Sequence, residues 1–507
     1  MAQEGDESVD GSIYALEEEG SSDDDDDDDD DYLYRWFPDI EDLCPASLHR
    51  LQINSPSIRL AISSQNWIEG AGLAIRNSTG LRDLIVDCGS HVEETHWLHE
   101  CCLGISHNRS LQSLTLVAYR PDLNLLQILT PFFKHNSNLR SLDIRDFYSE
   151  QSLNFLCSAL SYCNEDNCLK NIRIQNVNCP NDEDVGAFFD LLATQFHSLE
   201  TLGFHDIDIE RVGCTSFANL LINPEFKIAH LELGNNGIDP ERTMILRDAL
   251  ITNSSLESIT VLGNATFESI TGWRAFCSIF AHKMCTIKHL WIQETSICNE
   301  GATILGDALA TNTSLISLHI SQDNSITSVG WQGFSTCLRG RNSALEELYI
   351  GMCRMDDEGA GAIISALANN TTLSELTLNN DQDSFPNILP RILSDKTCIV
   401  KTHSSNHTLC KVAPFYLPLK KDIRRLLKMN RNKDKVEVAR QKILQQHFSE
   451  GNANIHVFAT MPETSLPFAI AWIGRSNDGR TLMYNFAQEF PSLLDISHKY
   501  GVNKRKR

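Results

Sequence analysis

The chain has 507 residues, a formal charge of −24 and 16 cysteines. No apolar run approaches the roughly 18 residues that a membrane-spanning helix needs, and the acidic, polar start does not resemble a secretory signal. The cysteines show no Cys-x-x-Cys spacing, which is typical of free thiols in a reducing compartment. Composition therefore excludes a membrane span and a disulfide framework, and it favours a cytoplasmic location, with the nucleus as the alternative.

The first 42 residues carry most of the negative charge. They hold 19 acidic residues against one base, Arg35, so −18 of the charge lies there and −6 in the rest of the chain. Nine consecutive aspartates, Asp23 to Asp31, cannot bury enough apolar surface to fold. We expect a disordered acidic tail over residues 1–42.

One short phrase, apolar-x-x-apolar-x-apolar, recurs every 28 to 31 residues. Its eleven copies begin at Leu81, Leu111, Leu139, Leu169, Leu199, Ile228, Leu256, Ile287, Leu315, Leu345 and Leu373. A degenerate copy lies upstream at Ser57, Leu60 and Ile62. A fixed period of this length is typical of a solenoid, each unit supplying a strand, a loop and a helix. We expect an N-terminal cap and the degenerate repeat over 43–80, then the solenoid over 81–410.

The helical parts of the late repeats share a second pattern. Glu300-Gly-Ala302 recurs as Glu358-Gly-Ala360, and Gly272-Trp273 recurs as Gly330-Trp331, both 58 residues apart. These residues resemble the leucine-rich repeats of the ribonuclease-inhibitor-like class, in which two repeat types alternate. The resemblance covers roughly residues 57–410. It implies an α/β fold, a leucine-rich-repeat solenoid (horseshoe) with a concave parallel β-sheet and convex helices, and it says little about function.

Asn-x-Ser/Thr triplets stand before most of the expected strands. They begin at Asn77, Asn108, Asn253, Asn264, Asn312, Asn369, Asn370 and Asn406. Because asparagine tolerates left-handed backbone geometry, we expect it to end the preceding helix in that conformation rather than to carry a glycan.

Motifs of catalytic chemistry are lacking. The sequence contains no Gly-Lys-Ser/Thr phosphate loop, no Gly-x-Ser-x-Gly elbow and no His-Glu-x-x-His. His91, His96, His99, Cys102 and His107 cluster in sequence, and three of them would share a helix face, but solvated or capping side chains explain them equally well. The sequence therefore predicts a non-enzymatic protein without a metal or cofactor.

The polar positions of the phrase predict a binding surface. The apolar positions of each strand point into the core, so the third, fifth and seventh positions project from the concave face. Three rings succeed one another at the fifth position, Trp291, His319 and Tyr349, beside His289 and Glu347 at the third. Because exposed Trp and Tyr are typical anchors of protein interfaces, we expect a protein partner there. The alternative is that the rings only stiffen the sheet or pack under the C-terminal extension.

A second candidate patch lies earlier in the sheet. Arg145, Arg173 and His205 project from neighbouring strands and could receive acidic groups of a partner.

After residue 410 the chain becomes basic. Residues 411–442 hold eleven bases against three acids, and we expect helices over 419–429 and 433–448. The apolar side of the first helix would cover the open end of the solenoid, so 411–500 is interpreted as a basic helical extension and small C-terminal cap. The extension could also bind the acidic tract Asp23 to Asp31 of the same chain, for which a separate basic partner is the alternative. It could instead bind nucleic acid, although the interleaved aromatic side chains typical of nucleic-acid binding are missing.

Two further segments complete the chain. Residues 466–475 and the apolar stretches after them resemble a C-terminal extension of predicted leucine-rich-repeat proteins from unicellular algae. The basic tail 501–507, with Lys504 to Arg507, could act as a nuclear import signal.

The combined interpretation is a non-enzymatic scaffold that binds a protein partner through the concave face. One alternative is a regulator of a small GTPase, because activators of the nuclear transport GTPase share this repeat class and an acidic segment. In those proteins the acidic segment follows the repeats, whereas here it precedes them. A proteinaceous enzyme inhibitor is the other alternative.

Overall fold

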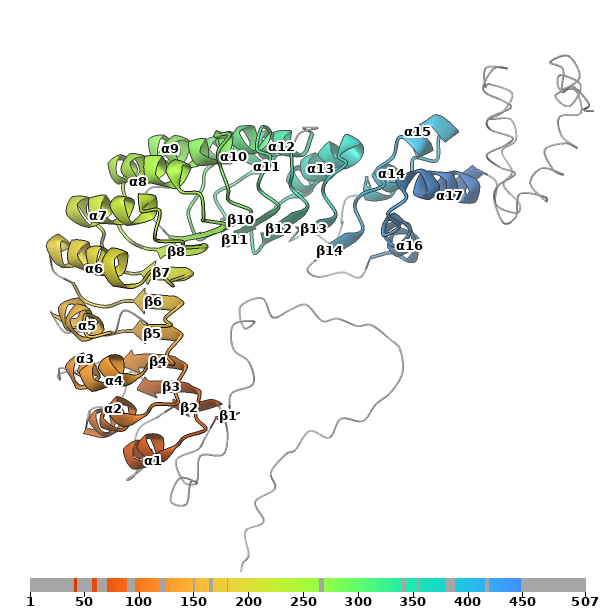
Figure 1. Ribbon diagram of the computed structural model, residues 1–507. Helices are drawn as coiled ribbons and strands as arrows, with labels where there is room; N and C mark the ends of the chain where they lie inside the picture. The colour runs from red at the N-terminus through yellow and green to blue at the C-terminus, as the bar shows by residue number, and fades with distance from the viewer. Residues whose placement is uncertain are drawn as a thin grey trace, which may run out of the picture.

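The computed structural model describes residues 41–42, 57–61, 71–88, 96–118, 125–148, 151–163, 167–179, 181–263, 269–339, 343–353, 355–378, 388–414 and 419–447. Within these ranges, strands and helices alternate along the chain. The strands form one parallel sheet in sequence order, and the sheet lines the inner side of a curved solenoid whose outer side is covered by the helices (Figure 1). The architecture is the expected leucine-rich-repeat horseshoe.

Fourteen strands belong to the described part of this sheet. They are β1 (Glu41–Asp42), β2 (Ser57–Ala61), β3 (Asp83–Cys88), β4 (Ser113–Ala118), β5 (Ser141–Arg145), β6 (Asn171–Gln175), β7 (Thr201–His205), β8 (His230–Gly234), β9 (Ser258–Leu262), β10 (His289–Gln293), β11 (Ser317–Ser321), β12 (Glu347–Gly351), β13 (Glu375–Leu378) and β14 (Lys411–Pro414).

The helices of the outer layer follow the strands one repeat at a time. They are α1 (Ala71–Asn77), α2 (His96–His107), α3 (Leu125–Ile128), α4 (Thr130–His135), α5 (Ser152–Leu160), α6 (Asp182–Gln195), α7 (Arg211–Ile222), α8 (Pro240–Thr252), α9 (Ile270–Ala281), α10 (Asn299–Leu309), α11 (Ser328–Phe334), α12 (Thr336–Arg339), α13 (Asp357–Ala366), the 3-10 turn η3 (Leu367–Asn369), α14 (Leu389–Leu393), α15 (Ile399–His403), α16 (Lys421–Asn430) and α17 (Lys435–His447).

The repeated phrase sets the register of the sheet. Its apolar residues are buried between the layers; Leu318 and Ile320 of β11, for example, are fully shielded from solvent. Each residue of the phrase is the cross-strand neighbour of the residue at the same position in the next copy, as Leu318 is of Leu348. The degenerate copy at Ser57 and Leu60 also forms a strand, β2, paired with β3. This pairing confirms that one phrase specifies one strand.

The sheet extends beyond the expected solenoid at both ends. Glu41 and Asp42 pair with β2, although they fall in the segment expected to be a disordered tail. Residues 411–414 pair with β13, although the phrase was expected to stop near residue 410. Leu409 and Val412, both buried, supply the phrase for β14, but they follow the copy at Leu373 by 36 residues rather than about 30. The longer step conceals this strand in the sequence.

Buried asparagines join neighbouring repeats, and they account for five of the eight Asn-x-Ser/Thr triplets. The side-chain nitrogen of Asn312 donates to the backbone oxygen of Phe280 in the preceding repeat (2.8 Å), and its side-chain oxygen accepts from the backbone nitrogen of Leu315 (2.7 Å). The same double contact is made by Asn108, Asn253, Asn370 and Asn406. All five are buried, which leaves no room for a glycan.

The expected left-handed geometry of these asparagines is wrong. Asn253 and Asn370 have φ values of −64° and −74°. Their backbone N–H groups bond to the end of their own helices, and their side chains cap a helix of the preceding repeat, so the helix ends without a left-handed residue. Left-handed residues occur elsewhere, directly after the strands, and many of them are Asn, Asp or Gly, which tolerate positive φ. This row consists of Asp146, Asn176, Asp206, Asn235, Gly263, Glu294, Gln322 and Met352.

Tryptophan and glycine explain the 58-residue alternation of the late repeats. The indole ring of Trp273 in α9 lies against Gly301 of α10, where a Cβ would come within 3.1 Å of the ring. Trp331 of α11 lies against Gly359 of α13 in the same way, at 2.9 Å. Both indoles are fully buried. Every second repeat thus supplies a large ring and the next one supplies the space for it.

The C-terminal helices cover the end of the solenoid. Ile423, Leu426 and Leu427 of α16 are buried in the common core. Lys442 of α17 is also fully buried, and its Nζ donates to the backbone oxygens of Leu393 (2.7 Å) and Asn406 (2.8 Å). Burial, together with nearby Lys435, lowers the pKa of Lys442 to about 7.

Several expectations fall on residues that the structure does not describe. These are the Asp23 to Asp31 tract, Ile62, His91, residues 466–475 and the basic tail at Lys504 to Arg507. Of the helices that are described, none is long and apolar enough to span a membrane.

Candidate partner-binding surface

The strand register brings the predicted rings side by side on the concave face. Trp291 of β10 is the cross-strand neighbour of His319 on β11, and His319 is the neighbour of Tyr349 on β12. Thr260 of β9 and Thr377 of β13 adjoin the row at its two ends. All three rings are half-buried. The sequence thus predicts the row correctly, residue by residue.

The rings form one continuous stack, which we call the aromatic ladder (His289, Trp291, His319 and Tyr349). Ring centroids lie 5.3 Å apart for Trp291 and His319 and 5.2 Å apart for His319 and Tyr349, with interplanar angles of 26° and 25°. His289 joins at the other side of Trp291, at 5.8 Å and 33°. Stacked rings restrain one another, so the ladder presents a preorganised surface.

The central ring of the aromatic ladder is uncharged at neutral pH. Burial and the neighbouring His289 lower the pKa of His319 to about 4. Burial also lowers the pKa of His289. The surface is therefore apolar in character at pH 7, despite its two histidines.

A glycine next to the aromatic ladder makes room for its last ring. A Cβ on Gly351 would overlap the Cε1 and hydroxyl atoms of Tyr349, which shows that the tyrosine ring lies over this glycine. The sequence alone does not indicate this role, because Gly351 follows Tyr349 by two residues and could equally end the strand.

Acidic side chains flank the aromatic ladder at the third position of the phrase. Glu347 is exposed and makes no ion pair with any described residue. Glu375 on the next strand lies 3.6 Å from Lys411 of β14, and beside β10 Lys288 pairs with Glu257 at 2.8 Å. Glu347 is therefore the carboxylate on this flank that stays available to a partner.

Earlier in the same sheet, charged side chains take the place of the rings. We call this region the charged stretch (Asp143, Arg145, Arg173, His205 and Glu232). Arg173 of β6 donates to both carboxylate oxygens of Glu232 on β8, at 2.8 and 2.7 Å. This pair crosses the intervening strand β7 at Gly203, where a Cβ would come within 2.9 Å of both partners.

Histidine and arginine complete the charged stretch. His205 lies over Gly234, with its Nε2 3.7 Å from Glu232. Burial opposes ionisation of Glu232, but the hydrogen bonds from Arg173 and the nearby His205 lower its pKa to about 2. Arg145 pairs with Asp143 of its own strand, at 2.9 and 2.6 Å.

The structure therefore gives each predicted arginine a carboxylate partner within the sheet. It brings Arg173 and His205 together around Glu232, and it holds Arg145 on Asp143. Sequence reasoning missed these partners, although both stand in the fifth-position row. The glycine between Arg173 and Glu232 is the signal that they can meet.

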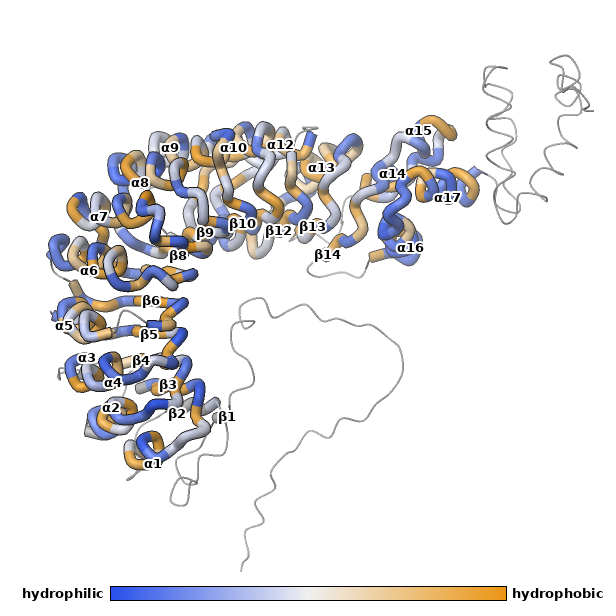
Figure 2. Tube along the Cα trace, viewed as in Figure 1, coloured by the Kyte–Doolittle hydropathy of each residue, from blue (hydrophilic) through white to orange (hydrophobic). Residues whose placement is uncertain are grey.

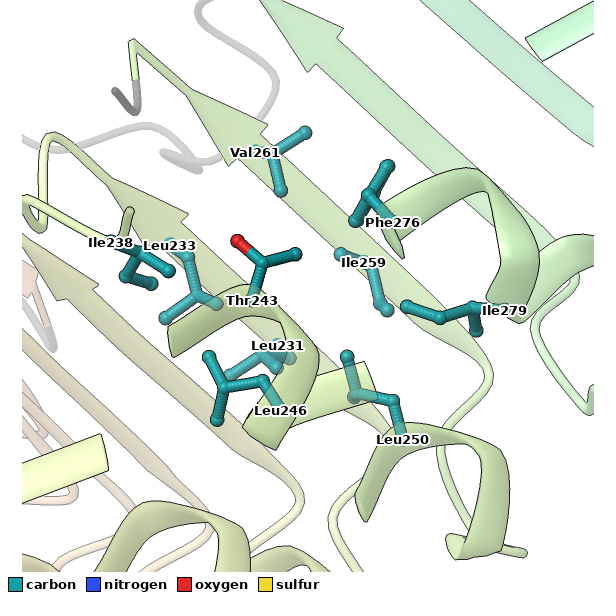
Figure 3. A pocket seen from close by; sticks show the side chains of 10 residues that line it. All are labelled: Leu231, Leu233, Ile238, Thr243, Leu246, Leu250, Ile259, Val261, Phe276 and Ile279. Carbon is teal, nitrogen blue, oxygen red and sulfur yellow. The ribbon is translucent and has the colours of Figure 1, made fainter. Parts of the chain in front are cut away.

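Metal binding does not compete with these surfaces in the part of the chain that is described. No group of three His, Cys, Asp or Glu side chains there could hold a metal ion. An apolar cavity lies inside the core rather than on the concave face, between β8, β9, α8 and α9 (Figure 3). It is lined by Leu231, Leu233, Ile238, Thr243, Leu246, Leu250, Ile259, Val261, Phe276 and Ile279. The cavity is a packing defect between two repeats.

Comparison with known proteins supports the same class. No protein-family model matches the chain. The chain is 25% identical to the ribonuclease inhibitor of Mus musculus over 250 residues, which cover 49% of this chain and 53% of that protein. It is 24% identical to NACHT, LRR and PYD domains-containing protein 14 of Mus musculus over 346 residues, which cover 62% of this chain and 34% of that protein.

The matched regions are partial, since the chain spans about half the length of the first relative and about a third of the second. A solved structure, described as the crystal structure of the Rad7 and Elc1 complex in yeast, is 15% identical with a TM-score of 0.35 and covers 61% of this chain and 79% of that one. So low a score adds nothing to the fold seen directly. The repeated phrase, the parallel sheet and the two relatives identify the chain as a ribonuclease-inhibitor-like leucine-rich-repeat protein.

Proposed function

We propose that the chain is a non-enzymatic scaffold that binds a protein partner through the concave face, with the aromatic ladder as the anchor. The observation that carries this proposal is the stack of Trp291, His319 and Tyr349 on one row of the sheet. Large rings bury much area at little cost in side-chain entropy, and Trp and Tyr are enriched among the residues that dominate binding energy.

The exposure of the aromatic ladder favours a partner-binding role over the alternative that the rings only stiffen the sheet. The rings are half-buried, so part of each still faces the solvent inside the horseshoe. None of the described C-terminal helices packs over them; α16 and α17 lie beyond β14, at the end of the sheet (Figure 1). Glu347 supplies a charge at the rim of the aromatic patch, and Gly351 fixes the pose of Tyr349. A partner with apolar side chains and a basic residue fits this surface.

The charged stretch is a second, weaker contact in this proposal. Arg145, Arg173 and His205 would have to exchange their present carboxylate partners for those of the partner protein. Exchange of one ion pair for another gains little free energy. We therefore assign the charged stretch to selectivity and the aromatic ladder to affinity.

Inhibition of an enzyme is the alternative that one observation favours. A relative that covers about half of this chain is named a ribonuclease inhibitor. An inhibitor is also a concave-face binder, and it differs only in that its partner is an enzyme. Regulation of a small GTPase is the further alternative, and it too rests on the identity of the partner.

The thiols support a reducing compartment as the place of action. Cys101 and Cys337 are fully buried, and burial raises the pKa of each to about 12. Both act as small apolar side chains between the helices and the sheet. Nothing about their surroundings points to a catalytic or disulfide role.

Quantitative affinity capture tests the proposal. The full chain, the Trp291→Ala/Tyr349→Ala variant and a Met244→Ala/Val329→Ala control are compared as bait; the control removes exposed apolar side chains from the outer helices instead. We expect proteins that are retained by the wild type and the control but lost from the ladder variant. Equal retention by all three, with all three folded by thermal melting, contradicts the proposal. Assaying the captured protein for GTP hydrolysis, or for enzymatic activity with and without the chain, separates the alternatives.

A further inference from the structure

A row of bases on α16 faces solvent at the C-terminal end of the sheet. Lys421, Arg424, Arg425 and Lys428 are all exposed, and their spacing of three and four residues places them on one side of the helix. Asp422, also exposed, is the only acidic residue of α16. We call these four residues the basic row.

The basic row is not needed to hold α16 in place. The opposite side of the helix is anchored by Ile423, Leu426 and Leu427, which join the core. Asn430, fully buried, adds a hydrogen bond from its side-chain nitrogen to the backbone oxygen of Leu409 (2.6 Å). These contacts account for the capping role of the helix, so the four charges are left without a structural explanation.

Several basic residues elsewhere in the molecule pair with carboxylates, whereas most of the basic row does not. Lys170, Arg274 and Lys288 each reach a glutamate of a neighbouring repeat. Lys421, Arg424 and Lys428 have no carboxylate partner among the described residues, and Arg425 donates to the side-chain oxygen of Gln445 (2.7 Å). Concentrated, unpaired positive charge attracts an anionic partner and shows up as salt-dependent binding.

The position of α16 leaves the basic row accessible. Figure 1 shows α16 level with the strand layer, beyond β14, whereas α15 continues the layer of outer helices. In Figure 2 the trace of α16 carries much of the blue of hydrophilic residues, beside β14. Lys433 and Lys435, exposed at the start of α17, extend the positive surface.

We propose that the basic row binds the acidic tract, Asp23 to Asp31, of a second copy of the chain. The charges are complementary: residues 1–42 carry −18, and nine of the carboxylates are consecutive. The row from Lys421 to Lys428 is about 10 Å long on a helix, a length that three or four extended residues match. The tract is therefore long enough to engage the whole row through charge-assisted hydrogen bonds.

The tract and the row of one copy lie at opposite ends of the sheet. The tract precedes β1, and the row lies beyond β14, the last strand in the sheet order. The sheet curves between these two ends, so a contact within one copy would have to cross the opening of the horseshoe (Figure 1). A contact between two copies joins the end of one solenoid to the start of the next and leaves the opening free.

The contact is head-to-tail, because the N-terminal tract of one copy meets the C-terminal helix of the next. Two copies can exchange their tracts in a closed pair, and further copies can add in a row, so association should increase with concentration and weaken with salt. It leaves the aromatic ladder uncovered, and it is therefore independent of the proposed function.

Sedimentation velocity of the full chain tests this inference. We expect the mean sedimentation coefficient to increase with concentration at about 0.05 M salt and to become constant at about 0.5 M. Arg424→Glu/Lys428→Glu should weaken association about tenfold or more, and so should changing the nine aspartates to asparagine. Arg109→Glu/Lys227→Glu makes the same change in charge at exposed sites elsewhere and should leave association unchanged.

A charge-swap experiment makes the test specific. A chain with Arg424→Glu/Lys428→Glu, mixed with a chain whose aspartates 23–31 are replaced by lysine, should associate again, although neither does so alone through this contact. No concentration dependence in the wild type, or equal association of the Arg424→Glu/Lys428→Glu variant, overturns the inference. A salt-dependent compaction that is independent of concentration also overturns it, because the tract would then bind its own copy.

Discussion

The charged stretch and the aromatic ladder occupy the same row of the same sheet, separated by one strand, yet their side chains are satisfied in different ways. In the charged stretch, Arg173 and Glu232 meet across Gly203, and Arg145 holds Asp143. In the aromatic ladder, Trp291, His319 and Tyr349 stack on one another. Both regions are preorganised, but the ion pairs are complete without a partner, whereas rings gain from every further apolar contact.

This difference teaches that exposure and residue type do not by themselves mark a binding surface. Arginine, like tryptophan, is enriched among interface anchors, and both regions project from the concave face. The deciding question is whether the fold already supplies the contact that a partner would offer. We therefore expect substitutions in the charged stretch to affect stability and substitutions in the aromatic ladder to affect binding.

The largest effect is expected from Arg173→Leu. The substitution leaves the carboxylate of Glu232, 17% exposed, without its main partner, and should lower the free energy of unfolding by about 3 kcal/mol. Arg173→Leu/Glu232→Leu should recover most of this loss in chemical denaturation. Lys288→Leu, which breaks an exposed pair, should change stability by less than about 1 kcal/mol. Equal losses for Arg173→Leu and Lys288→Leu would show that the charged stretch is not self-satisfied.

Trp291→Ala should weaken partner binding more than it lowers the stability of the fold. Loss of an aromatic anchor should weaken binding of a captured partner by about 2 kcal/mol, or roughly 30-fold, while the free energy of unfolding changes by about 1 kcal/mol or less, since the ring is only half-buried. Isothermal titration and denaturation of the same sample measure both quantities. A large loss of stability with unchanged affinity would assign the ring to the sheet instead.

Gly351→Ala should have a smaller effect on binding. The new Cβ displaces the ring of Tyr349 from the stack, and partner affinity should fall by about 1 kcal/mol, the contribution of an aromatic pair beyond its area. Gly361→Ala serves as the control, because a Cβ at this position of α13 meets no atom within 4 Å. It should stabilise the helix by about 0.5–1 kcal/mol and leave affinity unchanged. If both variants bind alike, the pose of Tyr349 does not matter.

The effect that is smallest at neutral pH, and that separates the two regions in acid, comes from His319 and Glu232. The pKa of His319 in the folded chain, about 4, lies below its ordinary value. The stability that the neutral ring gives to the fold is therefore full above about pH 6.5 and is lost as pH falls toward 4. The pKa of Glu232, about 2, is also lowered. The stability that its carboxylate gives to the fold is therefore present above about pH 4.5 and is lost as pH falls toward 2.

Urea denaturation at a series of pH values resolves these two windows. His319→Gln should flatten the fall in the free energy of unfolding between about pH 6.5 and 4, which is at most about 3 kcal/mol for this shift in pKa, and Arg173→Leu/Glu232→Leu should flatten the fall below about pH 4.5. A slope that stays the same in either variant contradicts the assignment of that window.

The sequence predicts the sheet and the row of rings because both follow from one repeated phrase. A period near 30 residues fixes which residues are neighbours across strands, and the register of Trp291, His319 and Tyr349 follows directly. The phrase fails where the period changes, which is why β14 was missed. It also says nothing about how far a side chain reaches.

Side-chain reach accounts for what the sequence could not predict. Arg173 finds Glu232 two strands away only because Gly203 leaves the path open. Asn312 and the asparagines like it cap a helix and bind the preceding repeat through their side chains, where backbone preference suggested a left-handed turn. In both cases the contact depends on the space between repeats, which a linear pattern does not report.

Photo-cross-linking tests the central claim, that a partner binds at the aromatic ladder, most directly. A photoreactive benzoyl-phenylalanine is placed at Thr377, the cross-strand neighbour of Tyr349, or at Gln175, two residues after Arg173 on β6. Both positions are half-buried on the concave face. We predict that a captured partner forms a cross-linked adduct with the chain labelled at position 377 and that this adduct is lost with Trp291→Ala. The chain labelled at position 175 should give much less adduct. An adduct at 175 alone, or one at 377 that survives Trp291→Ala, would contradict the account.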